Sequence, residues 1–206
     1  MDRNPRAERA FLMILCCSFA SGAVAGQVLA FRTPDAVAFE LRQSLTNYYR
    51  RPDAVQIAAL PLLLTWLQFP ALSFLWGFAA PGAAFVCLTA AAFGFLLSFS
   101  AGCFAAAFGW QGILLSAAAI GVRALISLPC FFLISLSSME RAARLFRLSS
   151  GRAAHSDALP AVRTRFPTLI LCGVILLTGA ALDYSVTPRL LRLALDWIVL
   201  RNGTGG

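Results

Sequence analysis

The sequence predicts an all-α integral membrane protein with about five transmembrane helices. With 59% hydrophobic and 13% charged residues, the chain has too little polar surface to coat a soluble globule of 206 residues. Residues 81–137 contain a single charged residue, Arg123. At roughly 20 residues per span, this length accommodates about four to six spans. We therefore expect one polytopic membrane domain over residues 1–206.

The first apolar run, residues 11–31, is long enough to cross a membrane. Its arginine-rich start imitates a signal peptide, but no persuasive cleavage site follows, so an uncleaved helix is favoured over a signal peptide. Gly22 and Gly26 form a small-xxx-small pair suited to helix packing. The five expected helices cover about 10–31, 54–78, 81–108, 112–137 and 166–186.

Two amphipathic helices are expected on the membrane surface. One follows the first span, where apolar residues recur at helical spacing over residues 36–48. The other is at the C-terminus, where leucine pairs alternate with charges over residues 189–200. These segments lie beside the spans rather than within them.

The second helix contains Pro61 and Pro70, which leaves two interpretations of residues 54–78. Either the whole run is one kinked helix, or residues 54–68 are interfacial and the span begins near Phe69. Buried proline kinks are tolerated in membranes when neighbouring groups satisfy the freed carbonyl. We favour the single kinked helix.

Residues 81–137 are expected to form a helical hairpin that turns at Gly109-Trp110-Gln111-Gly112. Before the turn, small residues recur every fourth position and share one helix face. Such a face allows close helix packing, either within the bundle, which we favour, or against a partner. The face consists of Ala90, Gly94, Ser98 and Gly102.

Residues 139–165 form the most basic loop, with six arginines against Glu140 and Asp157. The loop is expected to begin as a helical extension over residues 140–148. Because arginine accumulates on the cytoplasmic side, this loop and the N-terminus are expected inside. Five spans then put the Gly109 turn and the C-terminus outside.

Arg123 is the only charge deep in an apolar span, where a central arginine costs about 2.5–3.5 kcal/mol on insertion scales. It either pairs inside the bundle or extends its side chain toward the outer surface. Asp183, near the outer end of the last helix, is its natural partner, and such a pair would join the last two spans. The alternative for Asp183 is an exposed acid at a helix end.

The sequence offers no machinery for catalysis. Phosphate-binding glycine loops, nucleophile elbows and paired catalytic carboxylates are absent. The six cysteines lie in or beside apolar runs without a CxxC pair, which favours small core residues over a disulfide framework or a metal site. The single histidine, His155, lies in the loose part of the basic loop. We expect no metal, no cofactor and no enzymatic activity.

The whole layout resembles the stage II sporulation protein M family of bacterial membrane proteins. The resemblance rests on the length, the five-span order, Phe93-Gly94-Phe95 in the third helix, the short turn at 108–115, and the closing motif. That motif, Ala181-Leu182-Asp183-Tyr184-Ser185-Val186-Thr187-Pro188, has Asp183 where the family usually has Glu. The chain departs from the family in the fourth helix, where Gly121-Val122-Arg123 replaces the Pro and polar amide of relatives.

The resemblance implies a non-enzymatic scaffold in the bacterial cell membrane that recruits or anchors peptidoglycan hydrolases for septal wall remodelling and engulfment during endospore formation. The implied partners are a lytic transglycosylase and an amidase and endopeptidase, with anionic lipid on the cytoplasmic side and no nucleic acid. The alternative function is a permease or accessory membrane subunit of a transporter. Candidate partner contacts are Phe108, Gly109, Trp110, Gln111, Gly112, Asp183, Thr187 and Pro188.

Overall fold

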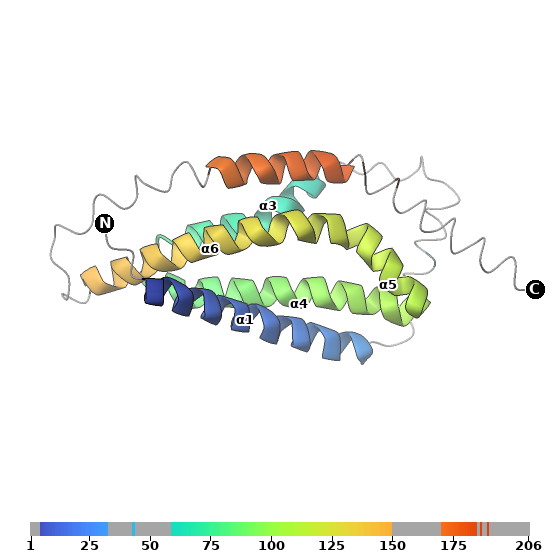
Figure 1. The fold of residues 1–206 in the computed structure, drawn as a ribbon, viewed down its shortest axis with the longest axis horizontal. Helices are drawn as coiled ribbons and strands as arrows, with labels where there is room; N and C mark the ends of the chain where they lie inside the picture. The colour runs from blue at the N-terminus through green and yellow to red at the C-terminus, as the bar shows by residue number, and fades with distance from the viewer. Residues whose placement is uncertain are drawn as a thin grey trace, which may run out of the picture.

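The computed structural model describes residues 5–32, 43, 59–149, 170–184, 186 and 189, and its regular elements there are helical. Figure 1 shows a bundle of long helices lying roughly side by side. In chain order the elements are α1 (Pro5–Phe31), α3 (Ala59–Trp76), α4 (Gly82–Phe108), α5 (Trp110–Ser116), the π-helix η2 (Ala117–Gly121), α6 (Val122–Ser149) and a last helix, Ile170–Tyr184.

The all-helical class is confirmed for this part of the chain. Three segments are long and apolar enough to cross a membrane: Arg9–Phe31, Gly82–Phe108 and Arg123–Phe146. The two other apolar helices, Leu63–Trp76 and Ile170–Tyr184, are shorter, so the count of five spans stays a prediction. The two expected surface helices lie outside the described residues, apart from Gln43 and Arg189.

The second expected helix is a single helix that runs through Pro70. Its described part spans Ala59 to Trp76, after which residues 77–81 turn into α4, and residues 54–58 lie outside the described part of the chain. A continuous helix through Phe69 agrees with the single-helix interpretation, and the position at which the span begins stays a prediction.

The turn between the third and fourth expected helices is shorter than the four residues that the sequence predicts. Gly109 alone separates α4 from α5, and α5 starts at Trp110. Gly109 has φ 61° and ψ −136°, a backbone conformation essentially confined to glycine. Gly112 lies in α5, where a Cβ would come within 1.9 Å of the Phe104 carbonyl oxygen. Both glycines therefore allow α5 to fold back against the end of α4.

The two predicted small-residue faces pack against each other. A Cβ at Gly22 would come within 1.9 Å of the Ala91 carbonyl oxygen, and one at Gly94 within 2.3 Å of the Phe19 carbonyl oxygen. The contact between α1 and α4 is the most extensive between helices of the described chain. Internal packing of both faces thus agrees with the sequence prediction.

This α1–α4 contact continues along the rest of the predicted ladder. The Ser98 hydroxyl donates to Gln27 Oε1 at 3.1 Å, and a Cβ at Gly102 would come within 2.4 Å of Ala30 Cβ. Residue numbers rise together along both helices, so α1 and α4 run parallel although they are far apart in sequence.

Helix direction alternates along the chain. Arg123 contacts the backbone of Thr65 and Ser138 lies beside Gly77, so α3 and α6 also run parallel, opposite to α4. The last helix runs antiparallel to α6, because Asp183 lies near Arg123 while Gly179 lies beside Ile126.

In Figure 1 the starts of α1 and α4 and the end of α6 meet at one end, and the turn into α5 lies at the other. We call these the arginine end, which carries Arg9, Arg141 and Arg144, and the turn end.

Two hydrophobic clusters hold the bundle together. The first joins α1, α4 and α6 and centres on phenylalanines, with Phe93 packed between Phe69 of α3 and Phe131 of α6. The second joins α3, α6 and the last helix through Trp66, Cys130, Ile134, Cys172, Leu176 and Ala180. The last helix is therefore attached to the bundle through α3 and α6.

Candidate functional site: a polar group between three helices

A buried polar group forms where α3, α6 and the last helix meet. Its members are Trp66, Arg123 and Asp183. The Trp66 indole N–H donates to Asp183 Oδ2 at 2.9 Å, and the two side chains are only 1% and 6% exposed. Tryptophan carries one donor and usually finds an acceptor when buried. Here that acceptor is the only carboxylate of the last helix.

The Arg123 guanidinium lies against the same tryptophan. Its carbon is 5.9 Å from the centroid of the Trp66 ring, a cation–π distance, and one of its nitrogens donates to the Thr65 backbone carbonyl. The charges of Arg123 and Asp183 also interact across the group. A half-buried arginine in an apolar bundle is stabilised when an acceptor, an aromatic face and an opposite charge lie near it, and this arrangement supplies all three.

Small residues create the space for this group. A Cβ at Gly179 would come within 2.8 Å of the Trp66 ring, so a larger residue there would displace the indole. On the α6 side, η2 ends at Gly121, two residues before Arg123. A π-helix inserts an extra residue into a turn and is frequent at functional sites. It rotates the face of α5 relative to that of α6, and Figure 1 shows the ribbon bending here.

One of the two sequence interpretations paired Arg123 with Asp183, and in the structure the two charges lie close enough to interact. The structure adds Trp66, which the sequence interpretation missed. A signal was present, because Trp66 lies inside an apolar helix and a buried indole N–H needs an internal acceptor.

The candidate partner contacts divide into exposed and buried residues. Trp110 is 74% exposed at the turn end and Gly109 is exposed beside it, while Phe108 and Gln111 are half-buried. Gly112 is buried against α4. Asp183 faces the interior, so its role as a partner contact stays a prediction. Thr187 and Pro188 lie outside the described residues.

The arginine end carries a second arginine with well-defined contacts. The Arg141 guanidinium lies 4.8 Å from the Phe74 ring centroid and 5.2 Å from that of Phe78. Its Nε donates to the Ser137 carbonyl and one terminal nitrogen to the Ser138 hydroxyl, both at 3.2 Å. The segment expected to extend the fourth helix over residues 140–148 is helical, because α6 continues to Ser149.

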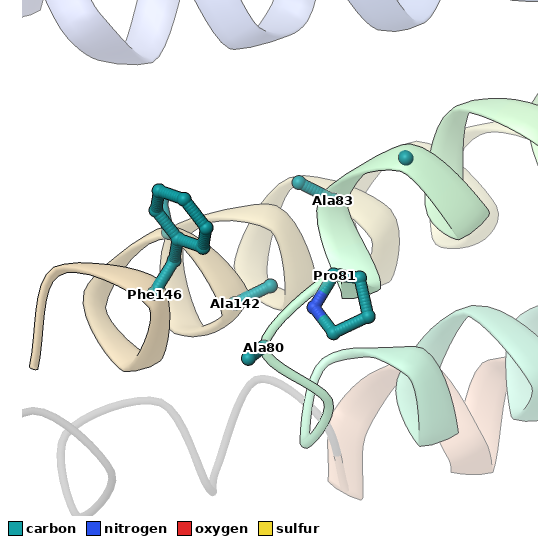
Figure 2. A pocket seen from close by; sticks show the side chains of 7 residues that line it. Ala80, Pro81, Ala83, Ala142 and Phe146 are labelled. Atoms are coloured by element: carbon teal, nitrogen blue, oxygen red, sulfur yellow. The ribbon is translucent and has the colours of Figure 1, made fainter. Parts of the chain in front are cut away.

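A shallow hollow lies beside this second arginine group, between the start of α4 and the end of α6. Figure 2 shows Pro81 and Phe146 on either side of it. Its lining is apolar and otherwise made of alanines. No nucleophile, acid or base faces it, so the hollow offers no means of catalysis.

The described residues contain no cluster of three or more His, Cys, Asp or Glu side chains that could hold a metal ion. The cysteines are all free thiols, and only Cys130 and Cys172 are buried. Comparisons with protein-family models, curated proteins and solved structures find no match for this chain. Function must therefore be argued from the arrangement of the chain itself.

Proposed function

We propose that this protein is a non-enzymatic membrane scaffold, similar to the stage II sporulation protein M family, that anchors peptidoglycan hydrolases at the outer face of the bacterial cell membrane. Its partners would be a lytic transglycosylase and an amidase and endopeptidase acting in septal wall remodelling. The observation that carries the proposal is the turn end, where the start of α5 presents exposed apolar side chains.

The positions of the arginines support a specific depth of the bundle in the membrane. Arg123 and Arg141 lie about five turns apart on α6, or ~27 Å at the usual helical rise, close to the ~30 Å hydrocarbon core. Arg9, Arg141 and Arg144 share one end, which the positive-inside rule assigns to the cytoplasm. The alternating helix directions are those that five crossings require, with the N-terminus inside and the C-terminus outside.

With this depth, the turn end projects outward. Phe93 and Phe131 lie at one level, and Phe108 is 15 residues from that level whereas Arg123 is eight, so the end of α4 lies ~10 Å beyond Arg123. Trp110, Ile113 and Leu114 are 74%, 48% and 45% exposed there. Exposed apolar side chains held outside the hydrocarbon core form the kind of patch that proteins bind. Hydrolases working on the wall reach this side of the membrane.

Co-purification tests the proposal with two exposed aromatic residues at opposite ends. Trp110→Ala alters the turn end, and Phe146→Ala alters the arginine end, where Phe146 is 59% exposed. Each protein would be purified from membranes together with the two tagged hydrolases. We expect recovery of the hydrolases to fall with Trp110→Ala and to stay at the wild-type level with Phe146→Ala.

Equal recovery with both variants would rule out the turn end as the docking surface. A deletion strain tests the biological role separately, since loss of the scaffold should stop migration of the septal membrane around the forespore. Normal engulfment combined with lost solute uptake would favour the transporter subunit instead.

A further inference from the structure

Hydroxyl side chains of three helices lie one helical turn from a layer of phenylalanines inside the bundle. Phe93 of α4 packs against Phe69 of α3 at 4.8 Å and against Phe131 of α6 at 4.9 Å between ring centroids. These three phenylalanines therefore lie at one level. The residues one helical turn nearer the arginine end lie on the same helix faces.

Those residues are Ser73, Thr89 and Ser135. Ser73 and Ser135 follow Phe69 and Phe131 by four positions, while Thr89 precedes Phe93 by four because α4 runs the opposite way. Ser73 and Ser135 are fully buried and Thr89 is 5% exposed. Three hydroxyls thus come from three helices to one level beneath the aromatic layer.

Two of these hydroxyls have no hydrogen-bond partner within the protein. The Oγ atoms of Ser73 and Ser135 are both buried and unpaired. Thr89 Oγ1 donates to the Phe85 carbonyl at 2.8 Å and keeps its capacity to accept. An unpaired hydroxyl in an apolar interior costs about 1–3 kcal/mol, so two at one level need an explanation.

A backbone carbonyl of α3 also lacks a helical donor, on the other side of the aromatic layer. Pro70 is buried and has no N–H, so the Trp66 carbonyl receives no helical hydrogen bond from position 70. In membrane helices the groups freed by proline are commonly satisfied by ordered water or by Ser and Thr side chains. Pro70 and Ser73 lie within one turn of each other on α3.

We propose that Ser73, Thr89 and Ser135 form an internal water-binding site between α3, α4 and α6. A buried water typically makes about three hydrogen bonds to groups that otherwise lack partners, which is the number of hydroxyls available. The water accepts from the Ser73 and Ser135 hydroxyls and donates to Thr89 Oγ1. It thereby links the three helices at a point where direct side-chain hydrogen bonds do not.

The competing arrangement is dry, with each serine hydroxyl turned back onto its own helix. Ser137 shows this geometry on the same helix, since its hydroxyl donates to the Leu133 carbonyl at 2.8 Å. In the dry arrangement the two serines contribute to stability independently of each other. In the hydrated arrangement both bind one water, so their contributions to stability are coupled.

A double-mutant cycle separates the two arrangements. Ser73→Ala, Ser135→Ala and the double variant would be unfolded reversibly in lipid–detergent micelles, with Ser21→Ala as the matched control. Ser21 is exposed and its hydroxyl donates to the Ser18 carbonyl of its own helix. We expect each core change to shift the unfolding equilibrium about fivefold, the double change to shift it by less than the product, and the control to have no effect.

Water-edited solid-state NMR of the wild-type protein in bilayers gives an independent measurement. Fast magnetisation transfer from water to the Ser73 and Ser135 signals, with slow transfer to the neighbouring phenylalanine rings, is the expected result. Slow transfer to both serines, or fully independent effects in the cycle, would overturn the proposal. Neither measurement depends on the hydrolases, so its outcome is distinct from that of the scaffold proposal.

Discussion

Replacing Trp66 by phenylalanine should destabilise the attachment of the last helix. The change keeps an aromatic ring but removes the N–H that donates to Asp183 at 2.9 Å. Hydrogen bonds between membrane helices average ~0.6 kcal/mol, but this acceptor is a buried carboxylate, for which about 1.5–3 kcal/mol is typical. The smaller ring also leaves a cavity beside Gly179. We expect a total loss of about 2–4 kcal/mol.

The free energy of unfolding should be measured by far-ultraviolet circular dichroism during denaturant titration in micelles, because Trp66 itself contributes to fluorescence. A second measurement is the labelling rate of Cys172, which is 2% exposed and packs in the same cluster as Trp66. If the last helix separates more often from the bundle, that thiol should react faster. Both measurements should change together.

Trp110→Phe is the matched control for this prediction. The chemical change is the same, but Trp110 is 74% exposed at the turn end, so the effect should stay within about 0.5 kcal/mol. In an Asp183→Ala background, Trp66→Phe should lose its hydrogen-bond contribution and keep only the cavity cost. Equal effects of the two tryptophan changes, or an undiminished effect in that background, would refute the assignment of the hydrogen bond.

Three further changes test other parts of the bundle. Gly94→Ala should lower the free energy of unfolding by about 1–3 kcal/mol, since its Cβ would come within 2.3 Å of a carbonyl of α1. Gly173→Ala is the control in the same denaturant titration and should be neutral or stabilising, because a Cβ there would have nothing within 4 Å. Gly109→Ala should cost about 1–3 kcal/mol because φ is 61°, and an unchanged thermal midpoint would contradict this turn geometry. Arg123→Leu should cost about 3 kcal/mol by leaving a buried charge, and in a double-mutant cycle its loss and that of Asp183→Leu should be less than additive; fully additive losses would show that the two charges do not interact.

The hairpin between the third and fourth helices was predictable from local sequence. A glycine pair around a tryptophan interrupts a long apolar run, and the spacing of small residues depends only on helical periodicity. The location of the break was right because a backbone conformation near φ 61° demands glycine at that point. The single-residue turn was not predictable, because the tight return of α5 depends on contact between Gly112 and the end of α4.

The structure was needed to identify which helix packs against each small-residue face. Gly22 and Gly94 each predicted close approach to some helix, but nothing in either segment identifies the other as its neighbour or sets their relative direction. That choice depends on shape complementarity over whole helix faces. The same reason explains why Trp66 was missed, since its acceptor lies 117 positions away in the chain.

The parallel contact between α1 and α4 has a consequence for biosynthesis. α1 enters the membrane first, but the helix that fills its glycine face is made only after the segment containing α3. At ordinary translation rates, α1 must therefore remain in the lipid for seconds with Gly22 and Gly26 facing hydrocarbon chains. During that interval the exposed face is open to another small-residue helix, including the α1 of a second nascent chain. Fidelity of assembly thus depends on α4 arriving before such a competitor.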